Sequence, residues 1–544
     1  MRKQKDVISI ENNLIERLEK RRLPGNLRFC FASAFALFLL VHFYWFKSKY
    51  MFADDSLLSP GGWAYLGFGR WALSTVREIS GRYSIPWFTG MLSALYMALA
   101  ASFVTATLRI ENKPAVFLAV LAMAAFTAVS KEVLYIHHID AKMLALLLVC
   151  AGCYATLKAR FGFIPGGLLF CLSLGIYQAY YSFSVFLLLF AVLLSCARDE
   201  KGWFRRGLRS IAALLIGVIG YKVVLDICLK AARKKLQAYG GASAMWDITP
   251  ALLLQRAKNA CSGLFSFYFS NESRLMVIAA AVLFAMCAVM GIALLLKNGV
   301  HRDWKRLLCT IAMILLLPLA SGSIWVMADT VPLRAQFALV APLLICAVLL
   351  DRMGVKEEAT SQGETSEEAT SQEETSQGET SQEETSREET KEGKRKLRCR
   401  ISLSVQALAL AACLLLSCCN AMQANEDYLN SDVTNKTAFS WYTRLASRIE
   451  EQAGQRTKYS VCFIGTPRKP AVPEGFNMST LIEETRILRY CSWYCGTNLV
   501  KASKESAAEI KETYGELIEK MPRYPREGSV QVIQGVVVVK FGNG

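Results

Sequence analysis

The chain has 544 residues, and 53% of them are hydrophobic, which is too high a fraction for an ordinary water-soluble protein of this length. Its formal net charge of +17 has the sign expected of a nucleic-acid-binding protein. The lysines and arginines, however, gather beside apolar stretches. We therefore exclude nucleic acid as a partner and expect a protein that is embedded in the lipid bilayer.

Apolar stretches of about twenty residues, each long enough to cross a bilayer, recur along the chain. The first follows a basic arm and has no small-residue cleavage site, so we expect a membrane span and not a removable signal peptide. The fold class predicted is an all-α polytopic membrane protein with about 11 transmembrane helices and a small C-terminal α/β extracytoplasmic domain. The expected spans are 29–46, 85–107, 115–130, 141–157, 163–178, 180–196, 210–228, 275–296, 307–327, 335–350 and 402–422.

Basic residues mark one side of the membrane. They cluster in the N-terminal arm 1–28, in 198–209, in 297–306 and in 394–400. With eleven spans all four clusters fall on the same side, and the positive-inside rule makes that side the cytoplasm. The N-terminus is then cytoplasmic and the tail extracytoplasmic. The outer segments 47–84 and 229–274 also carry basic residues, but long loops weigh less in this rule.

The domain plan follows from composition. Residues 29–350 form the transmembrane core, and residues 351–401 a cytoplasmic linker before the last span. Within the linker, repeats of Glu, Thr, Ser and Gln over 357–392 are expected to be disordered, as a spacer or as a tract of phosphorylation sites. The tail 423–544 has the pattern of a small α/β domain, and it contains no motif typical of catalysis.

In the tail, Tyr459–Gly465 has the pattern of a buried strand and residues 505–521 that of a helix. Residues 530–540 predict a strand pair that turns at Gln534 and Gly535. Most of the seventeen cysteines fall inside spans, where they act as small apolar residues. In the tail, Cys491 and Cys495 have two interpretations, a disulfide in an oxidising compartment or free thiols.

Polar residues at span ends are the candidate functional residues. Asp54 and Asp55 follow the first span, where carboxylates are costly to keep without a use; the alternative is that they cap an interfacial helix. Arg70 and Trp71 come about fifteen residues later. The Arg70 guanidinium either acts on a substrate or simply reaches the lipid headgroups.

A second polar cluster contains Glu132, His137, His138 and Asp140. These residue types can bind a metal ion, but their spacing matches no standard site, and a hydrogen-bonded polar turn is the other interpretation. A third candidate is Tyr177 with Gln178: the tyrosine fits an aromatic interfacial belt, whereas the amide is unexpected in apolar surroundings.

Arg334 stands at the outer edge of another span. It either holds a lipid phosphate through paired hydrogen bonds or marks the membrane interface.

These segments together resemble a known family. Over roughly residues 25–350 the chain looks like the GtrII-like membrane glucosyltransferases, the O-antigen-modifying, serotype-converting enzymes of GT-C type architecture. The resemblance is carried by Asp54-Asp55, Gly69-Arg70-Trp71, the turn Tyr135-Ile-His137-His138-Ile-Asp140 and Gly175-Ile-Tyr177-Gln178-Ala-Tyr180. The low-complexity linker departs from the pattern.

The resemblance implies a hexosyltransferase in the cell membrane that moves a sugar, glucose in this family, from a polyprenyl-phosphate donor. The acceptor would be an envelope polysaccharide or glycolipid on the outer side. Asp54 or Asp55 would act as general base, while Arg70 and Arg334 would neutralise the leaving phosphate. The remaining expected substrate-binding residues are Trp71, Glu132, His137, His138, Asp140, Tyr177 and Gln178.

No nucleotide-binding loop is present in the sequence, which agrees with a lipid donor. No cofactor is expected, and the need for a divalent metal stays open. Two other functions fit a multi-span chain of this kind. A polysaccharide polymerase is one; a transporter or flippase of lipid-linked sugars is the other, although internal repeats typical of transporters are not apparent.

Overall fold

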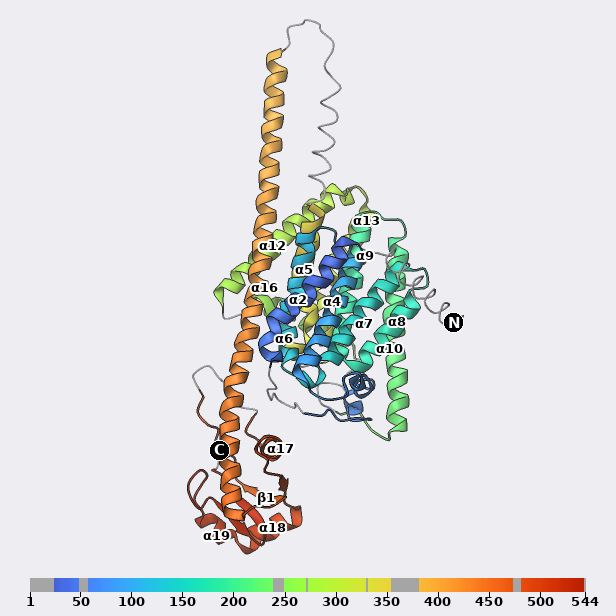
Figure 1. Ribbon diagram of the computed structural model, residues 1–544. Coiled ribbons are helices and arrows are strands. Elements are labelled where there is room, and N and C mark those ends of the chain that lie inside the picture. Colours follow the sequence, from blue (N-terminus) through green and yellow to red (C-terminus); the bar gives the residue numbers. More distant parts are fainter. Residues whose placement is uncertain are drawn as a thin grey trace, which may run out of the picture. The chain divides into compact units, whose positions relative to one another are not determined.

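The computed structural model describes residues 24–47, 57–237, 249–270, 273–328, 331–353, 381–472 and 481–542, with the backbone alone for 381–401. The chain divides into two compact units, and the boundary falls after Ala424 (Figure 1). The first unit is helical, whereas the second contains a small sheet. Each unit is described by itself.

The first unit is built from long apolar helices joined by short turns. The long helices are α2 (Gly25–Phe46), α4 (Pro86–Leu108), α5 (Lys113–Ala125), α7 (Ile139–Lys158), α8 (Phe163–Ile176), α9 (Tyr181–Ala197), α10 (Trp203–Ala231), α11 (Pro250–Phe269), α12 (Arg274–Lys297), α13 (Trp304–Ser321) and α16 (Ser381–Ala453). The short elements are η1 (Leu66–Phe68), α3 (Leu73–Val76), η2 (Arg77–Ser80), α6 (Thr127–Val133), η3 (Ile136–His138), η4 (Gln178–Tyr180), η7 (Val300–Arg302), α14 (Ile324–Met327), η8 (Leu333–Ala335) and η9 (Phe337–Val340).

Among the described residues, eight helices are long and apolar enough to cross a membrane, or nine if the bent pair α5 and α6 counts as one span. The prediction of a mostly helical, multi-span protein is confirmed. Three of the eleven expected stretches are not among these eight helices. The stretch 115–130 is the bent pair, α8 is short, and the stretch 335–350 begins with 3-10 turns before a helix over 341–353. The stretch 307–327 is one of the eight, as α13, but its helix ends at Ser321.

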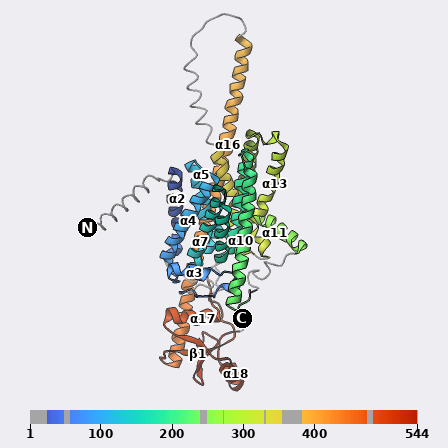
Figure 2. The ribbon, with the colours of Figure 1, turned by 90° about the vertical axis from the view of Figure 1, so that its right-hand side faces the viewer.

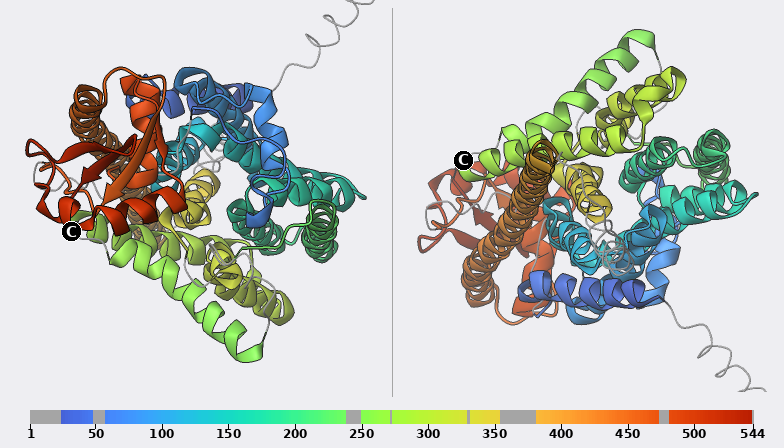
Figure 3. Two further views of the ribbon diagram at one scale, coloured as in Figure 1. Left: turned by 90° about the horizontal axis from the view of Figure 1, so that it is seen from below. Right: turned by 90° about the horizontal axis from the view of Figure 1, so that it is seen from above.

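Glycines allow α8 to approach α7 and α10 closely. The helix α8 packs on α7 and α10, and α4 packs on α2 and α7; Figure 2 and Figure 3 show these neighbours from other directions. A Cβ atom on Gly167 would lie 3.0 Å from the Ala213 carbonyl oxygen, and one on Gly217 would lie 2.7 Å from Phe170 Cβ. Small residues at such contacts are the usual means by which membrane helices pack, because lipid provides no hydrophobic drive.

The loops of this unit gather at two opposite ends. Residues 57–85, 134–138, 175–180 and 331–336 form one, which we call the loop end. There Ser59 Oγ donates to the His137 carbonyl at 3.1 Å, and Arg334 Nη1 donates to Tyr135 Oη at 2.8 Å.

The second end is formed by residues 109–113, 158–162, 198–209 and 351–353, and we call it the basic end. Arg109 Nη1 lies 2.8 Å from Glu200 Oε1, and the Asn112 amide donates to Asp351 Oδ1 at 2.8 Å. The helices α4, α7 and α9 each begin at the loop end and finish at the basic end, so the two ends lie on opposite faces of the bundle.

The last apolar stretch belongs to a longer helix than the sequence predicted. The helix α16 runs from Ser381 to Ala453, so it includes part of the repeat that was expected to be disordered. Five of the twelve residues 381–392 are Glu, which has high helix propensity. Residues 357–380, for which disorder was also predicted, lie outside the described residues.

The second unit contains a four-stranded sheet. Its strands are β1 (Tyr459–Ile464), β2 (Leu499–Lys501), β3 (Val530–Ile533) and β4 (Val536–Lys540), in the order β2-β1-β4-β3. The strand β1 is parallel to β2 and β4, and β3 is antiparallel to β4. The strand at Tyr459 and the hairpin at Gln534 and Gly535 are confirmed; both turn residues have positive φ, as a two-residue hairpin turn requires.

The helices of this unit are α17 (Glu484–Tyr490), α18 (Lys504–Thr513) and α19 (Gly515–Lys520), with a π-helical turn over Cys491–Cys495. The single helix predicted over 505–521 is therefore two helices that break at Tyr514. The short strand β2 was not predicted. The core holds Trp441, Tyr442, Ile449, Tyr490 and Val537.

Candidate functional site

A buried carboxylate lies at the centre of the polar residues of the loop end. The Glu132 side chain, on α6, is fully buried. Lys142 Nζ, on α7, donates to its Oε2, and the Tyr177 hydroxyl donates to its Oε1. We call Glu132, Lys142, Tyr177 and Tyr135 the Glu132 cluster. Burying an ionised pair is tolerated only when both charges are paired and hydrogen bonded, and this cluster meets that condition.

Two arginines border this cluster. The Arg70 guanidinium carbon lies 5.2 Å from the Tyr177 ring centroid, and that of Arg334 lies 4.8 Å from the Tyr135 ring centroid. Lys142 Nζ lies 5.1 Å and 5.0 Å from the same two rings. The aromatic faces are attractive to these cations. Among the described side chains three cations surround one carboxylate, so this group of residues has an excess of positive charge and suits an anionic group.

The local sequence explains how Arg70 and Trp71 are held. Gly69 has φ of 75°, and a Cβ atom there would lie 2.8 Å from Gln178 Nε2, so this turn needs glycine. Gln178 Nε2 donates to the Phe68 carbonyl at 3.0 Å, and Tyr221 Oη donates to the Gly69 carbonyl at 3.0 Å. The amide of Gln178 therefore fixes the backbone that carries Arg70.

The Trp71 ring packs against the backbone at Gly175, which has no side chain. A Cβ atom on Gly175 would overlap the Trp71 ring, and the Ala72 amide donates to the Gly175 carbonyl at 2.9 Å. The indole Nε1 is buried and has no hydrogen-bond partner among the described residues. Trp71 thus joins the loop before α3 to the end of α8.

Asp140 forms a separate buried ion pair. Both of its carboxylate oxygens accept from Arg77 Nη1, at 2.6 and 2.7 Å, and the two side chains are 3% and 0% exposed. Arg77 also donates to the Tyr83 carbonyl at 2.9 Å. This pair anchors the loop over 77–83 to the start of α7.

The rings of His137 and His138 lie against one another, tilted by 41°, with centroids 3.7 Å apart. The His138 ring also lies edge to face with the Tyr65 ring, with centroids 4.8 Å apart. Burial raises the pKa of Tyr65 above its ordinary value, so its phenol stays neutral at pH 7. Among the described residues, no group of three or more His, Cys, Asp or Glu side chains converges as a metal site would require. The cluster around His137 has the geometry of the packed polar turn.

Of the predicted site residues, the structure brings together Arg70, Glu132, Tyr177 and Arg334, and it places Asp140 in a neighbouring pair. Asp54 and Asp55, predicted as catalytic, lie outside the described residues. The sequence analysis missed Lys142 and Arg77. A lysine inside an apolar stretch is by itself a signal of a functional site, and Lys142 has that signal in the sequence.

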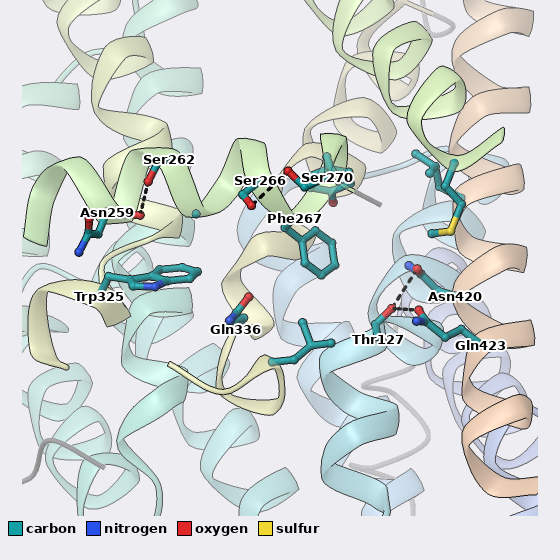
Figure 4. A pocket seen from close by; sticks show the side chains of 15 residues that line it. Thr127, Asn259, Ser262, Ser266, Phe267, Ser270, Trp325, Gln336, Asn420 and Gln423 are labelled. Atoms are coloured by element: carbon teal, nitrogen blue, oxygen red, sulfur yellow. Dashed lines mark hydrogen bonds between the residues drawn. The ribbon is translucent and has the colours of Figure 1, made fainter. Parts of the chain in front are cut away.

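A cavity of about 500 Å³ lies next to the cluster. It shares α6 with Glu132 through Thr127, and Leu333 and Gln336, on either side of Arg334, line it. In Figure 4, α11 runs across the view and presents Asn259, Ser262 and Ser266 to the cavity, while Asn420 and Gln423 of α16 face it from another side. The remaining lining residues are Gly263, Phe267, Tyr268, Ser270, Met276, Trp325 and Leu416.

Hydroxyl and amide groups share the lining of this cavity with apolar side chains, among which Trp325 offers a large flat surface. Thr127 Oγ1 lies 3.0 Å from Asn420 Oδ1, which fixes one wall. Polar groups of this kind beside an aromatic ring are suited to a neutral polyhydroxylated ligand. They offer little to a hydrocarbon chain.

The family model described as "Glucosyl transferase GtrII" matches residues 43–350, which is more than half of the chain. The match contains the Glu132 cluster and both bordering arginines. Comparison with curated proteins and with solved structures gave no match.

Proposed function

The chain belongs to the GtrII glucosyltransferase family, and on that premise we propose that it moves glucose from a polyprenyl-phosphate donor to an envelope polysaccharide or glycolipid. Family membership implies glycosyltransferase activity. The observation that supports the lipid-phosphate donor is the excess of positive charge around Glu132, next to a cavity lined by hydroxyl and amide groups.

The orientation proposed is that of the positive-inside rule. Arg109, Lys158, Arg198, Arg206 and Arg209 all lie at the basic end, which we assign to the cytoplasm. The loop end then faces outward. If α5 with α6, α8 and the helix over 341–353 each cross the membrane, the crossings number eleven, with the N-terminus inside and residues 425–544 outside.

Labelling of single cysteines on a cysteine-free background tests this orientation. Glu78, at the loop end, and Lys201, at the basic end, are both exposed. In intact cells, a membrane-impermeant maleimide should label Glu78→Cys and not Lys201→Cys. The opposite pattern would invert the topology.

In the reaction proposed, the acceptor hydroxyl oxygen bonds to C1 of the glucose while the bond from C1 to the phosphate oxygen breaks. The phosphate leaves with the bonding electron pair, and the hydroxyl proton passes to a carboxylate. Arg70 and Arg334 would stabilise the charge that develops on the phosphate. Both lie at the loop end, over aromatic rings that hold them in place.

The proposed base is Asp54 or Asp55. Asp55 precedes Leu57 by two residues in the chain, and the Leu57 carbonyl accepts from the Ser84 amide at the loop end, at 2.9 Å. Within the described residues, the candidate acids Glu132 and Asp140 both already accept hydrogen bonds from a cation. Because Glu132 and Asp140 are already paired with cations, we prefer Asp54 or Asp55 as the base.

The cavity beside the cluster is proposed to hold the acceptor sugar. Its amides and hydroxyls match the donors and acceptors of a saccharide, and the Trp325 ring offers a face on which a sugar ring can stack. The proximity of Gln336 to Arg334 in the chain would bring the acceptor close to the phosphate.

An assay with polyprenyl-phosphate glucose and extracted envelope acceptor tests the function. Asp54→Asn or Asp55→Asn should lower transfer by about 10²–10⁴-fold, as loss of a general base does. Glu78→Gln is the matched control, because it removes an exposed acid of the same end whose partner is Arg82 at 3.6 Å; it should keep wild-type transfer.

If both aspartate variants kept near wild-type turnover, Glu132→Gln would be tested as the next base. If no acid of the loop end affected transfer, the transferase mechanism would fail. A transporter of lipid-linked sugars would then be the better assignment.

A further inference from the structure

A second cavity lies at the basic end, on the opposite face of the bundle from the Glu132 cluster. Its volume is about 300 Å³, and residues at the ends of α4, α7, α9 and α10 line it. Five of its lining side chains are cationic and one is acidic. They are Arg109, Lys158, Arg198, Arg206 and Arg352, with Glu200.

The single acid of this lining is shared by three arginines. Glu200 lies 2.8 Å from Arg109 Nη1, 2.9 Å from Arg206 Nη2 and 3.7 Å from Arg198 Nη1. Arg352 pairs with Asp351 at 3.4 Å, but Asp351 Oδ1 also accepts two backbone amides. Glu111 is also close enough to act on Arg198 and Arg352. Three carboxylates therefore stand against five cations, and the cavity keeps an excess of positive charge.

Several hydrogen-bond donors around this cavity lack a partner. Thr107 Oγ1, Arg198 Nη2, Arg206 Nε and Arg352 Nε are all buried, and none has a hydrogen-bond partner among the described residues. A buried donor without a partner is unusual in a native protein and points to an ion, a ligand or water that satisfies it. Burial also lowers the pKa of Arg198 from its ordinary value.

The other lining residues indicate what kind of anion would enter. Leu108, Tyr154, Leu157, Ala191 and Leu194 form an apolar wall beside the cationic residues. A free inorganic anion gains nothing from such a wall. A lipid has both a charged headgroup and a hydrocarbon part, and basic pockets between membrane helices bind anionic headgroups in this way.

We propose that this cavity binds the phosphate of an anionic phospholipid from the leaflet that borders the basic end. The phosphate oxygens would accept from the Thr107 hydroxyl and from Arg198, Arg206 and Arg352. The glycerol and first acyl carbons would lie along α7 and α9. The bound lipid would neutralise repulsion among the arginines and join the ends of helices that lie apart in the chain. This site is independent of the transferase chemistry at the loop end.

The test is lipid binding by the purified full-length protein in neutral detergent, followed by native mass spectrometry and thermal unfolding. Phosphatidylglycerol, phosphatidylcholine and inorganic phosphate are compared as probes. Arg206→Gln should bind phosphatidylglycerol about tenfold more weakly or worse, since it removes a charge-assisted hydrogen bond. Arg205→Gln, an exposed neighbour outside the cavity, is the matched control and should bind as the wild type does.

Thr107→Val removes one unpartnered hydroxyl without changing charge, so it reports on the site even if the arginine variant fails to fold. It should also weaken binding. Equal binding by wild type, Arg206→Gln and Thr107→Val would overturn the proposal. If inorganic phosphate stabilised the protein as much as phosphatidylglycerol does, the occupant would not be a lipid. If phosphatidylcholine bound as tightly as phosphatidylglycerol, the site would not select an anionic headgroup.

Discussion

Replacing Lys142 by methionine should strongly destabilise the first unit, because it leaves the Glu132 carboxylate buried without its cation. The side chains of Lys142 and Glu132 are 5% and 0% exposed, and Lys142 Nζ donates directly to Glu132 Oε2. Among the described donors, the Tyr177 hydroxyl alone would still donate to that carboxylate. Methionine has a similar length and no charge, so the cavity created is small.

The expected magnitude follows from the burial of the pair. Two unit charges 4 Å apart attract by about 4 kcal/mol at an effective dielectric constant of ~20. Removing one partner of a buried pair costs about 3–5 kcal/mol, since the remaining charge is uncompensated. The double variant Glu132→Gln with Lys142→Met removes both charges and should recover most of that loss. Glu78→Gln breaks a half-exposed pair with Arg82 and should cost at most about 1 kcal/mol.

The measurement is the free energy of unfolding in mixed micelles, with the wild type, the two single variants, the double variant and Glu78→Gln compared. Glucose transfer by each variant is measured in parallel. A loss below about 1 kcal/mol for Lys142→Met would refute an ionised, paired Glu132. Wild-type transfer by the double variant would exclude Glu132 as the base, whatever its effect on stability.

Three further predictions concern other parts of the chain. Gly175→Ala should cost about 1–3 kcal/mol in unfolding free energy and lower transfer, because the added methyl group overlaps the Trp71 ring. The hydrogen bond from Cys491 lowers the pKa of Cys495 to about 7, so alkylation of Cys495 by iodoacetamide should rise steeply around pH 7 instead of near its ordinary value of 9.0. Deleting residues 357–380 should leave thermal stability and transfer nearly unchanged, since the segment has no apolar residue beyond alanine to pack.

Controls for these three come from the same chain. Gly291→Ala adds a methyl group where nothing lies within 4 Å, so it should cost far less than Gly175→Ala. Burial raises the pKa of Cys462, which should therefore stay slow to alkylate through neutral pH. Equal rates for Cys462 and Cys495 at pH 7 would contradict the lowered pKa, and loss of activity on deletion of residues 357–380 would indicate a regulatory role for that segment.

Apolar length was enough to predict that the chain has many membrane-spanning helices, but not where those helices break. The helices α5 and α6 meet at Phe126 with a bend of 44°. No proline or glycine stands there. Phe126 is fully buried, with its ring centroid 5.4 Å from that of Phe267 and 6.2 Å from that of Phe337. The bend therefore depends on tertiary packing by distant residues, which no local pattern reports.

The candidate site, too, could be predicted only in part. The sequence identified Glu132, Tyr177, Arg70 and Arg334 as polar residues at span ends, because such residues are conspicuous against an apolar background. Their partners were not predictable. Arg77, for instance, lies 63 residues from Asp140 in the chain, so only the folded bundle shows that this acid is already neutralised.

The separation in sequence between the charged residues indicates when they meet as the protein folds. Glu132 and Lys142 are ten residues apart, on the consecutive helices α6 and α7, so their charges can pair before distant segments join the bundle. This lowers the cost of burying a lysine in the first turn of a membrane helix. Arg70 and Arg334 come from distant segments and reach the cluster only when the unit has folded, where they lie over aromatic rings. The excess positive charge therefore arises with the folded bundle, at the place where a phosphate would have to be held.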